Sequence, residues 1–153
     1  MSDVYCEDYI KLISHRGNIS GPNPDHENSP KYLHSALLSG FLVELDVWNI
    51  NDVWFLGHDY PKYKIDIDWL TGKRSALLCH AKNVTALQFL LKNNYHCFWH
   101  ENDDYTLTNK GIPICYPNRS FFEGCILMKV EHFANPILQP CWGICSDYIS
   151  LYK

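Results

Sequence analysis

Short apolar runs recur along this chain, and residues that favour turns stand between them. Runs of about four to eight residues that are rich in β-branched and aromatic side chains, and bounded in this way, are typical of strands. The pattern predicts strands at residues 11–15, 41–48, 53–57, 76–80, 96–100, 112–116, 125–130 and 142–146.

Two stretches have a helical period instead. Residues 30–39 place their apolar side chains on one side, with Ser29 as the N-cap and Pro30 in the first turn. Residues 84–94 repeat this pattern, and their cap is Asn83 or Thr85. Strands that alternate with helices favour a parallel sheet with crossover helices.

Connections in the second half of the chain are too short or too rich in proline for long helices: residues 101–111, 117–124 and 131–141. We therefore expect an α/β fold, a small or incomplete TIM-type (β/α) barrel with reduced helices in the second half. A complete barrel of this type has about 250 residues, whereas this chain has 153. We expect a single domain over residues 1–153, because the chain shows no repeat and no low-complexity segment.

Charge and hydropathy exclude two classes of partner. A formal net charge of −4 and a pI near 6.0 give no basic surface for nucleic acid. No apolar run approaches the roughly 20 residues of a membrane span, so we expect no integral membrane segment. The N-terminal residues lack the basic and apolar regions of a signal peptide. We therefore expect a cytoplasmic protein.

The chain has 7 cysteines, an odd number, and several lie inside apolar runs. This pattern predicts buried thiols in a reducing compartment rather than a disulfide framework. Cys141 and Cys145 form the only close pair, whereas a cysteine zinc site normally has two such pairs.

The strand predicted at residues 41–48 carries two acids within an apolar run. Residues two apart in a strand share a face, so Glu44 and Asp46 point together while Leu45 points into the packing. Two ionised carboxylates side by side repel each other and lose hydration, and a hard divalent cation removes both penalties. The alternative is that both acids form salt bridges with lysines on an exposed face of the sheet.

Two histidines lie at predicted strand ends. His15-Arg16-Gly17 ends the first strand, and Gly57-His58-Asp59 follows a hairpin through Asn51 and Asp52. In the cleavage of a phosphodiester, one imidazole can take the proton of the nucleophilic hydroxyl while the other protonates the leaving alkoxide. Arg16 offers a planar donor fork to phosphate oxygens. Taken singly, each histidine is more often a structural hydrogen-bonding residue.

Together, these motifs resemble the signature of the glycerophosphodiester phosphodiesterase family. The segments SHRGN, HENSP, FLVELDVW and GHD follow one another within residues 13–59. In that family, a His-Arg-Gly strand end precedes a Glu-Asn turn, a Glu-x-Asp strand and a His-Asp pair. The resemblance implies a TIM barrel related to phosphatidylinositol-specific phospholipase C. It also implies that His15 and His58 are the catalytic acid–base pair and that Arg16 binds the phosphate. Glu44 and Asp46 match two metal ligands, and Glu27 matches the glutamate of the Glu-Asn turn, which lies beside the phosphate and the metal.

Downstream, the match continues with one departure. Where the family has Glu-x-Lys, this chain has His80-Ala81-Lys82, so Lys82 matches the lysine that faces the phosphate. His80 replaces the third, acidic metal ligand, and an imidazole there tilts the preference from calcium towards magnesium, manganese or zinc. The segment GICSDYI at residues 143–149 resembles the closing strand of the family.

The resemblance favours a metal-dependent phosphodiesterase that acts on a small glycerophosphodiester-like substrate, with Mg²⁺ or Ca²⁺ expected first and Mn²⁺ or Zn²⁺ as alternatives. The same residues would serve a lyase that stops at a cyclic phosphate, and the head group is left open. The rival is a non-catalytic phosphate- or metal-binding protein on a reduced barrel. A barrel short of helices exposes apolar strand faces, which predicts a homodimer or a higher oligomer that covers strands of the second half.

Four further residues have open roles. Trp99 and His100 would stack against the substrate or bind phosphate if they point inward. Asp59 is expected to shape its turn or to orient His58, and Asp147 is expected to cap a strand end.

Overall fold

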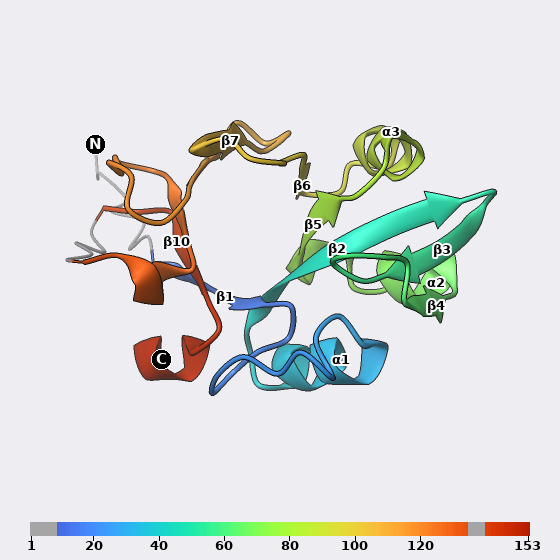
Figure 1. Ribbon diagram of the computed structural model, residues 1–153, viewed down its shortest axis with the longest axis horizontal. Coiled ribbons are helices and arrows are strands. Elements are labelled where there is room, and N and C mark those ends of the chain that lie inside the picture. The colour runs from blue at the N-terminus through green and yellow to red at the C-terminus, as the bar shows by residue number, and fades with distance from the viewer. Residues whose placement is uncertain (1–8, 135–139) are drawn as a thin grey trace, which may run out of the picture.

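The computed structural model describes residues 9–134 and 140–153, and their strands form one curled, mixed sheet (Figure 1). The strands of these residues are β1 (Lys11–His15), β2 (Leu42–Ile50), β3 (Val53–Leu56), β4 (Tyr63–Ile65), β5 (Leu77–Ala81), β6 (Cys97–Phe98), β7 (Tyr105–Leu107), β8 (Pro113–Cys115), β9 (Ile126–Met128) and β10 (Gly143–Ser146).

Strand β1 lies at the centre of this sheet. It pairs in parallel with β2 on one side and with β10 on the other. Parallel pairing continues from β2 to β5 and β6, and from β10 to β9 and β8. Strands β3 and β4 add an antiparallel extension to β2, and β7 adds one to β8. The carboxyl ends of the parallel strands therefore meet at one edge of the sheet.

The helices are few and unevenly distributed. The α-helices of the described residues are α1 (Pro30–Leu38), α2 (Ile67–Thr71) and α3 (Val84–Lys92), and the 3₁₀ helices are η1 (Arg74–Ala76), η2 (Val130–His132) and η3 (Ile149–Tyr152). In Figure 1, the α-helices lie along the part of the sheet formed by the first half of the chain. Among all the described residues, no helix combines the length and the apolar character that a membrane crossing requires.

The expectation of a TIM-type (β/α) barrel is wrong. Helices alternate with parallel strands only as far as β6, and beyond it loops and short 3₁₀ turns connect the strands of the described residues. The antiparallel strands β3, β4 and β7 also make the sheet mixed. Short connections in the second half leave no room for the outer helices that complete a barrel of this type.

The individual strands and helix caps agree with the sequence-based prediction more closely than the overall fold does. Each predicted strand is present near its expected position, and the side-chain oxygens of Ser29 and Asn83 cap α1 and α3 by accepting from the backbone N–H groups of Tyr32 and Ala86. Asn83 rather than Thr85 is therefore the cap of the second helix. The short elements β4, α2 and β7 were not predicted, because they lack a run long enough to show a period.

The hairpin between β2 and β3 follows the prediction. Asn51 and Asp52 both have positive φ angles, of 51° and 63°, and Ile50 pairs with Val53 across the turn. Two consecutive residues of this kind match the right-handed twist of the flanking strands, and Asn and Asp tolerate this conformation.

The two faces of β2 have opposite character. Val43, Leu45 and Val47 are fully buried in the hydrophobic core beneath α1 and α3. Glu44 and Asp46 lie on the other face, as the alternation predicts, and they are buried as well. The strand therefore anchors the acid pair through the apolar residues between and beside its members.

The cysteines within the described residues are buried, and those at positions 79, 97, 115, 125 and 145 are free thiols. The burial of these thiols was predicted, and Cys6 lies outside the described residues.

Replacement of Leu45 tests this anchoring. Leu45→Ala removes a fully buried side chain from the core, and we expect it to lower the free energy of unfolding by about 2–5 kcal/mol. Leu38→Ala is the matched control, because Leu38 at the end of α1 is 76% exposed, and it should change stability by no more than about 0.5 kcal/mol. Urea denaturation measures both variants, and equal losses would contradict the packing described.

Candidate active site

A cavity of about 370 Å³ lies at the carboxyl ends of the parallel strands. Most residues that the sequence predicted for the site line it: His15, Arg16, Glu44, His58, His80 and Lys82. Asp46 is fully buried beside these residues, and Glu27 lines a neighbouring cavity of about 340 Å³. Arg16 and His58 line both cavities, so they stand where the two meet.

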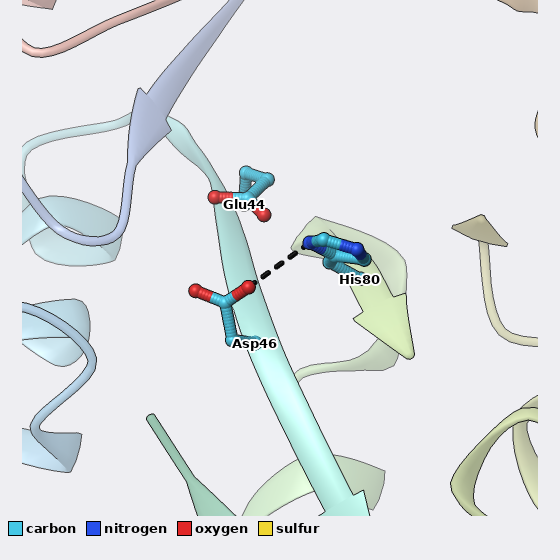
Figure 2. Close-up of side chains that lie close together, drawn as sticks. All are labelled: Glu44, Asp46 and His80. Atoms are coloured by element: carbon cyan, nitrogen blue, oxygen red, sulfur yellow. Dashed lines mark ion pairs between the residues drawn. The ribbon is translucent and has the colours of Figure 1, made fainter. Parts of the chain in front are cut away.

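Three side chains converge on one point of the wall. Glu44 and Asp46 on β2 lie next to His80 on β5, whose backbone is paired with that of Asp46 (Figure 2). Each residue offers one ligand atom, and these atoms lie within 4.8 Å of one another. All three residues are buried, so they form a compact cluster of two carboxylates and one imidazole.

Asp46 is held by donors on every side. Asn28 donates its side-chain N–H to Asp46 Oδ2 at 2.8 Å and accepts the backbone N–H of Asp46 at 2.9 Å. Arg16 Nε lies 3.3 Å from Oδ2, and Lys82 Nζ lies 3.9 Å from Oδ1. Burial alone would raise the pKa of Asp46, but the contacts with His80 and Arg16 hold it well below its usual range. Asp46 is therefore ionised.

Glu44 has fewer neighbouring donors and basic groups than Asp46. Its oxygen Oε2 is buried and accepts no hydrogen bond, and its contact with a basic group is His15 Nε2 at 3.9 Å. Burial and the charge on Asp46 raise the pKa of Glu44. Asp46 Oδ1 also accepts no hydrogen bond. Buried acceptors without a donor are rare in proteins, and two of them in one cluster fit a cation.

The hydrogen bond of His80 determines which ring nitrogen faces the acids. His80 Nε2 lies 3.0 Å from the carbonyl oxygen of His100, and a carbonyl oxygen only accepts, so Nε2 carries the hydrogen. His80 Nδ1 lies 3.0 Å from Asp46 Oδ1; it donates to this oxygen when both ring nitrogens carry a hydrogen, and its lone pair is available to a cation when the ring is neutral. Metal-binding histidines typically donate their other N–H to a carbonyl in this way. The hydrogen bond of Nε2 therefore leaves Nδ1 as the ring atom that can bind a metal.

His15 is oriented by Asp147, which follows β10. Its Nδ1 lies 2.6 Å from Asp147 Oδ1, and the same oxygen accepts the side-chain N–H of Asn18 at 2.8 Å. Burial alone would raise the pKa of Asp147, but the hydrogen bonds from His15 and Asn18 and the charge on Lys129 hold it well below its usual range. Because the carboxylate accepts at Nδ1, the Nε2 atom of a neutral His15 is left without a hydrogen and faces Glu44.

The capping role expected for Asp147 is therefore replaced by contact with His15. Asn18, Asn28 and Lys129 are further site residues that the sequence did not single out. The Glu-Asn turn contained a signal for Asn28, and the resemblance of residues 143–149 to the closing strand of the family contained one for Asp147.

His58 stands on a turn that requires glycine before it. Gly57 has a φ of +149°, and a Cβ there would lie 2.2 Å from the carbonyl oxygen of Tyr60. The His58 side chain is 40% exposed, and its Nδ1 lies 2.8 Å from Asp59 Oδ1, which confirms that Asp59 orients it. Burial and the charge on Arg16 lower the pKa of His58.

Glu27 contacts the arginine rather than the converging cluster. Its Oε2 lies 3.4 Å from an Nη of Arg16, and its Oε1 accepts the side-chain N–H of Asn18 at 2.8 Å. Its role as a metal ligand stays a prediction. His100 lines the cavity and stacks on Tyr116 with ring centroids 3.7 Å apart, whereas Trp99 is not among the lining residues.

Comparison with known proteins adds no relative: none of the protein-family models, curated proteins or solved structures compared with this chain matches it. The resemblance to glycerophosphodiester phosphodiesterases therefore remains a prediction from the motifs.

Because the negative charge of Glu44 is poorly balanced, we expect its removal to make the folded protein more stable. Since the pKa of Glu44 is raised in the folded protein, its ionisation costs folding free energy at every pH above the ordinary glutamate pKa. Glu44→Gln should therefore be more stable than the wild type at pH 8 in chelator, and this advantage should disappear below about pH 4.

Denaturation in urea across this pH range measures the effect. The control is Glu123→Gln, which removes an exposed carboxylate and should show no such gain. A Glu44→Gln protein that is less stable than the wild type at pH 8 would contradict this account of the carboxylate.

Proposed function

We propose that the protein is a metal-dependent phosphodiesterase that cleaves small glycerophosphodiester-like substrates, with two histidines as base and acid. The proposal rests on one observation: His15, His58, Arg16 and Lys82 line one cavity with the buried Glu44, and the buried Asp46 lies beside them. This combination suits acid–base attack on a phosphodiester, because it joins proton transfer to the binding of negative charge.

Glu44, Asp46 and His80 would hold the divalent ion. Their ligand atoms lie close together, two carboxylate oxygens accept no hydrogen bond, and the N–H of His80 is directed away from the acids. Two carboxylates and one imidazole suit magnesium or manganese, and calcium or zinc are the alternatives. When bound, such an ion supplies positive charge that stabilises the negative charge developing on the phosphate.

His15 is the group that takes the proton. Asp147 accepts the Nδ1–H, which keeps the lone pair on Nε2, the atom that faces the cavity wall at Glu44. This relation between a buried aspartate and a histidine orients a general base in other enzymes. The proton comes from the attacking hydroxyl, either a neighbouring hydroxyl of the glycerol or water, as its oxygen bonds to phosphorus.

His58 is the group that gives a proton, and the leaving alkoxide receives it as its bond to phosphorus breaks. Arg16 lies between the two cavities, so its guanidinium can bind phosphate oxygens while the two arms of a diester extend to either side. Lys82 lines the same wall and adds a second positive charge. The product is a cyclic phosphate when the glycerol hydroxyl attacks, and a monoester when water does.

Cleavage of glycerophosphoglycerol, which has both a neighbouring hydroxyl and an alkoxide leaving group, tests the proposal. We expect turnover by the wild type with added Mg²⁺ or Mn²⁺, and its loss in chelator. His15→Ala and His58→Ala should each lower kcat by about 10²–10⁴-fold, the usual contribution of general acid–base catalysis. His34→Ala, which removes an exposed histidine of α1, is the control and should retain full activity. Turnover that survives both histidine variants would contradict the proposal, and its absence in the wild type would favour a non-catalytic binding protein.

The orientation of His58 by Asp59 predicts a shift of the pH profile. As an acid, His58 must be protonated, so activity falls as pH rises through its pKa. The hydrogen bond that His58 donates to Asp59 raises the pKa of His58 against the opposing effects of burial and Arg16. Asp59→Asn should therefore move the alkaline limb of kcat/KM to lower pH while activity at acid pH is kept. An unmoved limb, or one moved to higher pH, would exclude His58 as the acid.

A further inference from the structure

Two cations of the cavity have an unusual backbone conformation. Among the described residues, the non-glycine residues with positive φ are asparagines and aspartates, except Arg16 at 55° and Lys129 at 54°. Asparagine and aspartate adopt this left-handed region readily, whereas for other side chains it costs about 1–2 kcal/mol. Both exceptions line the same cavity, each directly after a strand. Such strain in a native structure often marks a residue whose side chain must point to a functional site.

Arg16 has a role in the proposed mechanism, and Lys129 has none. Lys129 follows β9 and directs its Nζ to within 3.4 Å of Asp147 Oδ2. Asp147 already accepts from His15 and Asn18, so it does not depend on this lysine alone. The Lys129 side chain is 35% exposed, and an ammonium group has three donors. Donors therefore remain for a ligand in the cavity.

Lys129 and Lys82 lie on the two sides of β1. Lys82 follows β5 and contacts Asp46, which lies on β2, whereas Lys129 follows β9 and contacts Asp147, which follows β10. Strands β2, β1 and β10 lie between β5 and β9, and neighbouring strands are about 4.8 Å apart. A phosphate held by Arg16 and Lys82 therefore leaves Lys129 for a different group of the same ligand.

We propose that Lys129 binds a second oxyanion of the substrate, a phosphate or carboxylate on one arm of the phosphodiester. This inference rests on the proposed function and narrows its substrate class to diesters that carry a further negative charge. The net charge of the chain is −4, so such a substrate requires local cations, and the cavity wall has them on both sides of the catalytic histidine.

A matched pair of substrates tests this. Glycerophosphoglycerol and the same diester with a phosphate on its far glycerol differ by one oxyanion. We expect the wild type to prefer the phosphorylated diester, and Lys129→Met to lower the ratio of the two kcat/KM values by about tenfold, the effect of a charge-assisted hydrogen bond. Any effect through Asp147 acts on both substrates and cancels in this ratio. Lys64→Met, which removes an exposed charge of β4, should leave the ratio unchanged, and Lys129→Arg should restore most of it.

Lys129→Gly is a second variant, because glycine adopts the left-handed conformation without strain and should fold where methionine does not. In Lys129→Gly, the ratio of the two kcat/KM values should fall as far as it does in Lys129→Met. A ratio unchanged in both variants, or a wild type that prefers the unphosphorylated diester, would overturn the inference.

Binding measured without turnover separates this inference from the proposed function. Calorimetric titration of each diester into His58→Ala protein, with and without Lys129→Met, should give the same tenfold difference in Kd. If neither diester is hydrolysed but this difference is found, the proposed function fails and the second oxyanion site stands. If both diesters are hydrolysed but their Kd values show no such difference, the proposed function stands and the second oxyanion site fails.

Discussion

The structure depends on the burial of two like charges on one strand. Glu44 and Asp46 lie side by side on β2, almost wholly removed from water. Like charges about 4 Å apart repel each other by about 4 kcal/mol at an effective dielectric constant of 20, before any loss of hydration is counted. The chain can hold them there because the opposite face of the strand is anchored in the hydrophobic core, and because cationic groups gather around the pair from β1, β5 and the loops.

Asp46 has more hydrogen-bond donors and basic groups around it than Glu44 has. Asp46 has Asn28, Arg16, Lys82 and His80 around it, and its pKa is low. Glu44 has a distant contact with His15, at 3.9 Å, and its pKa is raised. A positive charge between these acids and His80 would complete the cluster. For this reason we interpret the cluster as a metal site rather than as a set of surface salt bridges.

The sequence predicted what depends on short-range periodicity. Alternation along residues 41–48 placed both acids on one face, and the caps at Ser29 and Asn83 marked where the helices begin. The predicted barrel was wrong. That prediction came from the parallel strands and the family resemblance, but the short connections after β6 do not form the helices that a barrel requires.

The missed site residues have a different cause. Asp147 contacts His15 across 132 positions of the chain, and Lys129 is placed by a single left-handed residue. Neither position has a periodic signature; the pairing of β10 with β1, and of β9 with β10, brings both residues to the site.

Titration calorimetry of a divalent ion tests the central claim most directly. Mg²⁺, Mn²⁺ and Ca²⁺ are added separately to protein freed of metal with chelator, in the wild type and in Asp46→Asn and His80→Ala. The account predicts one site per chain for at least one of these ions, loss of that site in Asp46→Asn, and weaker binding in His80→Ala. A wild type that binds none of them, or an Asp46→Asn protein that binds as tightly as the wild type, would contradict it.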